Sequence, residues 1–194
     1  MKNERKSLFV IVTILAVAVL GLSIAYAALS TTLTARLGTV TQSPQLWEVG
    51  FEPGTVAGQK SGTSTEDITC SNATVTQSQA SVDGIALAKP GDTCTYQLKI
   101  KNTGTIDANL SLITPTQPDG VTCNASGANM VCGDLTYKLT TDQAGSNILT
   151  ANRLLEKSTG ELTVYLIATY SGTNVSSGSV THTGVQFTLT YNQA

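Results

Sequence analysis

The stretch KPGDTCTYQLKIKNTG, residues 89–104, carries the clearest secondary-structure signal in the chain. Pro90-Gly91 indicates a turn, because Gly adopts the positive φ that other residues resist. From Thr93 to Asn102, apolar and polar residues alternate with the two-residue period of a strand that has one buried face. The side chains that we expect on this buried face are those of Cys94, Tyr96, Leu98 and Ile100.

The same period continues beyond the next turn. Asn102-Thr103-Gly104 reverses the chain, and apolar residues follow at Ala108, Leu110 and Leu112. The pattern predicts that the strands on the two sides of this turn form an antiparallel pair with one solvated face.

Short alternating segments separated by turns rich in Gly, Ser and Asn make up most of the remaining chain. We expect further strands at Leu46–Phe51, Asp67–Thr76, Leu135–Thr140, Glu161–Tyr170 and Val185–Tyr191. The stretches expected to be loops are residues 53–65, 114–134 and 171–184, while residues 77–88 are ambiguous. Apolar residues recur at helical spacing in Asn147–Lys157, although a loop with a short strand is the alternative. Residues 41–194 are therefore predicted to form an all-β domain, an antiparallel β-sandwich of jelly-roll type.

The N-terminus has a different character. A short basic segment precedes an apolar run, Leu8–Leu29, which is long enough to cross a bilayer as a helix. Small residues before the bond between Ala27 and Ala28 fit a signal-peptidase cleavage site. We expect residues 1–27 to be a hydrophobic helix that serves as a signal peptide, with a retained membrane anchor as the alternative. In both cases the remainder lies outside the cytoplasmic membrane, because the positive end stays inside.

Residues 28–40 alternate in the same way as the strands of the body. The face that carries the large apolar side chains contains Leu29, Leu33 and Leu37. This pattern predicts an N-terminal strand. The strand could pair within its own domain, pair with another copy, or serve as a linker above a retained anchor.

Composition argues for an exported protein and against nucleic acid as a partner. Charged residues are 12% of the 194-residue chain, against about 25% in an average soluble protein. The formal net charge is -2, and no basic run follows the leader. We therefore expect no nucleic-acid binding, and membrane contact only through the N-terminal hydrophobic segment.

Four cysteines favour disulfides in an exported chain. Their three possible pairings are not separable by sequence, and buried free thiols are the alternative. We favour Cys123–Cys132, which would close a loop rich in Gly, Asn and Ser. Cys70–Cys94 would then tie two predicted strands together.

Catalytic and metal-binding patterns are missing from the sequence. His182 is the one histidine, and no H-E-x-x-H motif accompanies it. We expect it to be a solvated loop residue, and we expect neither an enzyme nor a cofactor. The carboxylates beside predicted turns are more typical of turn stabilisation than of calcium binding; they are Asp83, Asp92, Asp107 and Asp119.

Several of these motifs, in this order, resemble the TasA/camelysin family of exported bacterial surface and biofilm-matrix proteins. The junction Tyr26-Ala27-Ala28-Leu29 is similar to the family's leader junction, which a dedicated SipW-type signal peptidase cuts. Lys89-Pro90-Gly91-Asp92 and the later Asn102-Thr103-Gly104-Thr105 resemble the family's K-P-G-D…N-x-G-[ST] hairpin. Leu162–Tyr170 and Val185–Tyr191 fit its closing pair of strands.

This resemblance implies a secreted or cell-surface subunit of an extracellular fibre. In such fibres the mature N-terminal strand completes the sheet of the next subunit, and the anchors here would be Leu29, Leu33 and Leu37. The partners would be other copies, joined head to tail, and a signal peptidase during export. The alternatives are a membrane-anchored adhesin or binding module and, with less support from the residues, a camelysin-like metallopeptidase.

Overall fold

The computed structural model describes residues 45–62, 67–173, 182 and 185–194. These residues belong to one unit, Pro44–Ala194, and they form antiparallel strands and connecting turns without a helix. The expected all-β antiparallel fold is thus confirmed. No helix of the described residues is long and apolar enough to cross a membrane. The predicted signal peptide, residues 1–27, and the predicted N-terminal strand, residues 28–40, lie outside the described residues.

Fifteen strands are present in the described part of the chain. In chain order they are β1 (Val49–Phe51), β2 (Gly54–Val56), β3 (Gln59–Ser61), β4 (Thr69–Cys70), β5 (Ala73–Val75), β6 (Ala80–Val82), β7 (Ile85–Ala86), β8 (Thr93–Asn102), β9 (Ala108–Thr116), β10 (Asn124–Ser126), β11 (Asn129–Cys132), β12 (Leu135–Thr140), β13 (Arg153–Leu155), β14 (Gly160–Tyr170) and β15 (Gln186–Gln193).

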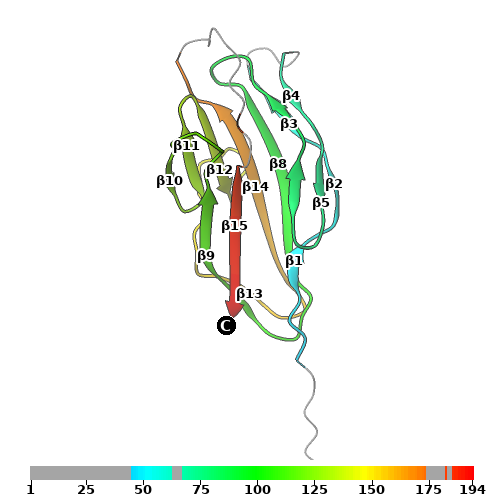
Figure 1. The fold of residues 1–194 in the computed structure, drawn as a ribbon. Coiled ribbons are helices and arrows are strands. Elements are labelled where there is room, and N and C mark those ends of the chain that lie inside the picture. Colours follow the sequence, from blue (N-terminus) through cyan, green and yellow to red (C-terminus); the bar gives the residue numbers. More distant parts are fainter. Residues whose placement is uncertain (1–44, 63–66, 174–181, 183–184) are drawn as a thin grey trace, which may run out of the picture. The chain divides into compact units, whose positions relative to one another are not determined.

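Two sheets make up most of the domain (Figure 1). The larger has seven strands in the order β1-β8-β14-β12-β11-β10, with β3 also paired to β8. Its centre is the long pairing of β8 with β14, which runs from Asn102 opposite Gly160 to Thr93 opposite Thr169. The second sheet has the order β13-β9-β15. Two small sheets, β2-β5-β6 and β4-β7, flank them.

The two main sheets share one hydrophobic core, which gives the domain a sandwich-like construction. The predicted inward face of β8 is confirmed, since the side chains of Cys94, Tyr96, Leu98 and Ile100 are all buried. Leu110 of β9 and Val164 of β14 belong to the same cluster. The alternation of apolar residues thus determines which face of each strand meets the other sheet.

A β-bulge corrects the predicted face of β9. Leu110 lies opposite Tyr191 and Leu112 lies opposite Thr190, so Ser111 is an extra residue on β9. One extra residue reverses the alternation beyond it. As a result Leu112, which we expected to point inward, is 55% exposed, and Ile113 is buried in its place.

The predicted pairing of β8 with β9 is wrong, because the two strands lie in different sheets. The buried side chain of Asn102 stabilises the connection between them. Its Nδ2 donates to the carbonyl oxygens of Ile106, at 2.8 Å, and Leu155, at 3.0 Å, while its Oδ1 accepts from the N–H of Gly104 at 3.1 Å. The N-T-G segment therefore carries the chain from one sheet to the other and does not close a hairpin.

Five further expectations need correction. The expected closing pair of strands is not formed, since β14 pairs with β8 and β12 while β15 pairs with β9. Asn147–Lys157 is not a helix but a loop with a short strand, β13, and Asn152 adopts a φ of 64° there. Residues 53–65, expected to be a loop, contain β2 and β3. The turn-rich segment 114–134 also contains β10 and β11. The predicted strand Leu46–Phe51 is shortened to β1.

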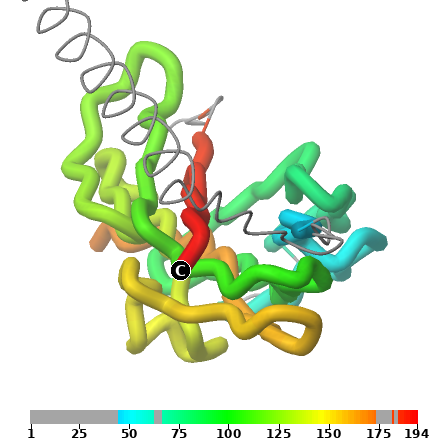
Figure 2. Tube along the Cα trace, turned by 90° about the horizontal axis from the view of Figure 1, so that it is seen from below, coloured from blue at the N-terminus to red at the C-terminus, as the bar shows by residue number. Residues whose placement is uncertain are grey.

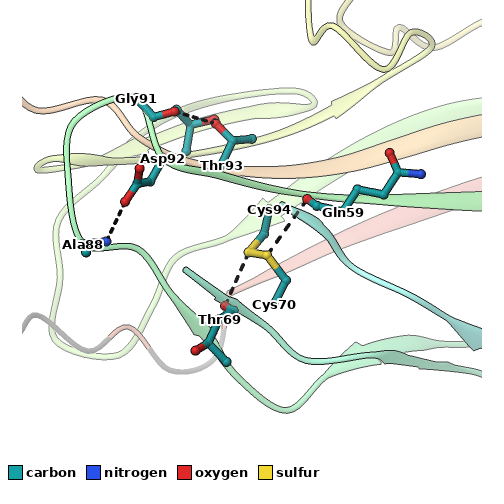
Figure 3. Close-up of a disulfide and its surroundings, with 9 residues drawn as sticks. Gln59, Thr69, Cys70, Ala88, Gly91, Asp92, Thr93 and Cys94 are labelled. Atoms are coloured by element: carbon teal, nitrogen blue, oxygen red, sulfur yellow. Dashed lines mark hydrogen bonds between the residues drawn. A yellow bond between two sulfur atoms is a disulfide. The ribbon is translucent and has the colours of Figure 1, made fainter. Parts of the chain in front are cut away.

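Both favoured disulfides are confirmed. Cys70–Cys94 joins β4 to the buried start of β8 (Figure 3). Cys123–Cys132 joins the loop before β10 to the end of β11. Two bridges fit an oxidising environment.

Candidate functional site

The most suitable interaction site on the described residues is the outer edge of β15. This strand is the last of the sheet β13-β9-β15, and none of the described strands pairs with its other edge. It spans eight residues, Gln186–Gln193, whereas the end strands β10 and β13 span three residues each. A long unpaired edge offers a row of backbone donors and acceptors to an incoming strand.

The backbone groups at this edge can be assigned from the pairing of β15 with β9. Pro115 lies opposite Phe187 and has no N–H to donate. In an antiparallel ladder, hydrogen-bonded and non-bonded pairs alternate, so the Phe187 position suits a non-bonded pair. The N–H and C=O groups of Phe187, Leu189 and Tyr191 therefore point toward the open edge.

The same three residues carry the apolar side chains of β15. Phe187, Leu189 and Tyr191 pack against the hydrophobic core but are only partly buried. By contrast, Thr188 and Thr190 on the opposite face are exposed. A strand added beside β15 would cover the apolar row and bind the free backbone groups in one step.

The side chain of Tyr191 shows that part of the surface beside β15 is shielded from water. Its hydroxyl is buried and has no hydrogen-bond partner among the described residues, and burial raises its pKa to about 12. The phenol is therefore neutral at physiological pH. A side chain with a hydroxyl or carbonyl group that reached it would satisfy an otherwise unpaired donor.

The start of β1 and the C-terminus lie at the same end of the domain (Figure 2). Leu46 exchanges backbone contacts with Thr105, whose N–H donates to the Leu46 carbonyl at 2.8 Å. Two residues further along, Asp107 accepts from the N–H of Ala194 at 2.9 Å. The chain therefore enters the domain at the end where β15 finishes, and β15 begins about half-way along the domain (Figure 1).

The predicted turn carboxylates and histidine are only partly as expected. Asp92 is fully buried, and its Oδ2 accepts from the N–H groups of Ala88 at 2.9 Å and Lys89 at 2.8 Å, which confirms a role in the turn (Figure 3). His182 is not simply solvated, because its Nδ1 lies 2.8 Å from the Tyr137 hydroxyl. Burial lowers the pKa of His182 and raises the pKa of Tyr137 to about 12.

Metal-binding clusters are absent from the described residues. No group of three or more His, Cys, Asp or Glu there could hold a metal ion. One buried oxygen atom of Asp92 and one of Asn129 have no hydrogen-bond partner among the residues that the structure describes.

Of the site residues predicted from the sequence, only the cysteines fall on described residues. The cleavage residues Ala27 and Ala28 and the strand anchors Leu29, Leu33 and Leu37 lie outside them. The edge of β15 was missed at the sequence level. Its alternation was recognised, but which strands are neighbours is not encoded locally.

The class that the described residues define is an all-β, disulfide-bonded, sandwich-like domain with one long open strand edge. Comparison of the chain with protein-family models, curated proteins and solved structures finds no match. The resemblance to the TasA/camelysin family therefore rests on the sequence motifs alone.

Proposed function

We propose that this protein is an exported, non-enzymatic structural subunit of an extracellular fibre, such as a biofilm-matrix filament. In this proposal the domain is of jelly-roll type, and residues 28–40 of one copy pair with the open edge of β15 in the next copy. The observation that carries the proposal is the row of partly buried side chains, Phe187, Leu189 and Tyr191, beside unpaired backbone groups.

The N-terminal strand has the pattern that this edge requires. Its leucines, Leu29, Leu33 and Leu37, recur at even spacing and would share one face. Full burial of one leucine side chain contributes roughly 1.5–3 kcal/mol. Three such anchors, together with a completed backbone ladder, provide enough driving force to offset the cost of ordering a strand.

Export and cleavage would create the donor. Removal of residues 1–27 by a signal peptidase leaves Ala28 as the new N-terminus, only one residue before Leu29. Donation of this strand from copy to copy in one direction does not close on itself, so it generates a filament. The two disulfides and the low charge fit a protein that works outside the cell.

Deletion of Ala28–Leu37 from the mature protein tests the proposal. The deletion variant keeps the core and both disulfides, and we expect a folded domain that forms no filaments under the electron microscope. Because it retains the β15 edge, it should also accept a donor strand, stop growth and shorten filaments when mixed with intact protein. Filaments formed by the deletion variant alone would contradict the proposal.

A further inference from the structure

Two exposed apolar side chains stand where the chain enters the domain. Leu46 is 52% exposed and Trp47 is 43% exposed. Single exposed apolar side chains are common on protein surfaces, so the case for a contact rests on where these two side chains lie.

Hydrogen bonds hold this segment firmly in place. The N–H of Leu46 donates to the Thr105 Oγ1 at 2.9 Å, and the N–H of Thr103 donates to the carbonyl of Glu48 at 3.0 Å. A Cβ at Gly104 would collide with the Leu46 carbonyl oxygen, so glycine is needed for the two segments to approach this closely. Leu46 and Trp47 are therefore presented from a fixed part of the domain.

The direction of donation follows from where this segment lies. Leu46 lies at the end of the domain where β15 finishes. If a donor strand entered the next copy at that same end, the same ends of the two domains would face each other. Each copy could then donate its strand to the other, and the pair would close as a dimer. Growth of a filament requires entry at the other end of the strand, where β15 begins, so the donor runs antiparallel to β15.

The short link between donor strand and domain limits their separation. Only residues 41–45 lie between the predicted strand and Leu46. Fully extended, a link of this length spans roughly 20 Å. Leu46 and Trp47 of the donating copy must then lie close to the start of β15 in the accepting copy.

We propose that Leu46 and Trp47 form a second contact between consecutive copies, seated on the neighbouring domain near the start of β15. This inference rests on the proposed fibre function. An aromatic residue that becomes buried between two copies would act as an anchor of the interface.

Trp47 reports on its own burial, because it is the one tryptophan of the chain. The fluorescence of the purified mature protein is followed as its concentration rises, with iodide as a quencher and electron microscopy on the same samples. We expect the emission to shift to shorter wavelength and quenching to fall at the concentration where filaments appear. Filaments whose tryptophan emission and quenching match those of the monomer would overturn this inference but leave the fibre function intact.

Two other outcomes would also overturn the inference. If no filaments form at any concentration, the fibre function fails together with it. If the emission shifts while sedimentation shows only closed dimers, the contact lies between like ends and the antiparallel direction is wrong.

A pair of variants separates this contact from general surface hydrophobicity. Trp47→Ser should raise the critical concentration for filaments at least about fivefold, as expected for an interface anchor. The control is Leu154→Ser, which removes a 57% exposed side chain from β13 and should leave assembly unchanged. Equal effects of the two substitutions would overturn the inference, and circular dichroism of both variants verifies that the fold is retained.

Discussion

The N–H of Asn152 donates to the carbonyl of Leu110 at 2.6 Å, on the side of β9 that faces β13. Leu110 lies opposite Tyr191, so its carbonyl is directed away from β15. This agrees with the position of Pro115 opposite Phe187. Both observations indicate that the backbone N–H and C=O groups of Phe187, Leu189 and Tyr191 point to the open edge of β15.

Substitution of Leu189 by proline tests this assignment. Proline removes an N–H that β9 does not use, so the domain should fold, since proline is tolerated on an edge strand whose N–H faces outward. The incoming strand would lose a donor and meet the proline ring. We therefore expect Leu189→Pro to abolish filaments in sedimentation and electron microscopy.

The matched control is Leu189→Ala, which loses nearly the same side-chain packing but keeps the N–H. It should still form filaments, at a higher protein concentration. Thr188→Pro should instead destabilise the fold, because the N–H of Thr188 faces β9. If Leu189→Pro assembled as well as Leu189→Ala, the edge would not be the acceptor.

Tyr96 predicts how stability depends on alkaline pH. Its side chain is fully buried, its hydroxyl has no partner in the part of the chain that the structure describes, and burial raises its pKa to about 12. The unfolded chain ionises near pH 10, so between pH 10 and 12 the folded state binds more protons and its stability falls as pH rises.

Tyr96→Phe should reduce this alkaline loss. At pH 8 it should leave the free energy of unfolding unchanged or raise it by up to about 1 kcal/mol, because no hydrogen bond is lost. Urea unfolding at pH 8 and pH 11 measures both effects. A loss of more than about 1 kcal/mol at pH 8 would mean that the hydroxyl has a partner.

The two disulfides should differ in their contribution to stability. Cys70–Cys94 joins residues 24 apart and Cys123–Cys132 joins residues 9 apart. From loop entropy, removing the first should cost roughly 3.5 kcal/mol and removing the second roughly 2.7 kcal/mol. Replacement of each pair by alanine, followed by urea unfolding, measures the difference, and a larger loss for Cys123–Cys132 would contradict this ranking.

Local sequence patterns predicted individual strands and the disulfide pairs. The alternation from Thr93 to Asn102 predicted β8 with its bounds and its buried face, since a strand with one wet face repeats every two residues. The cysteine pairs followed from compartment and from the loop that Cys123 and Cys132 close. No long-range information was needed for either.

Long-range relationships were not predictable from the sequence. Asn102 looks like a turn residue, but its hydrogen bonds to Ile106 and Leu155 hold a connection between sheets. The bulge at Ser111 reverses the face of β9 without a local signal. In β13, Leu155 is buried and Leu154 is exposed. This short strand carries apolar residues on both faces, so their spacing matched that of a helix.

The proposed site also has one part that the sequence predicted and one part that it could not predict. The sequence predicted the donor, Ala28–Val40, from alternation and the cleavage signal. It could not predict the acceptor, because the exposed edge of β15 depends on which strands lie beside β9. A donor strand can be recognised in isolation, whereas an acceptor edge exists only in the folded domain.

The most direct test of donation between copies is a disulfide placed across the proposed pair of strands. With Leu33 opposite Leu189, an antiparallel register places Thr34 opposite Thr188. The mature protein carrying both Thr34→Cys and Thr188→Cys is oxidised as filaments form and run on a denaturing gel without reductant. We expect a ladder of covalently linked multimers, which is absent when either cysteine is omitted. A monomer bridged within its own chain would show that the strand pairs with its own domain and would contradict donation between copies.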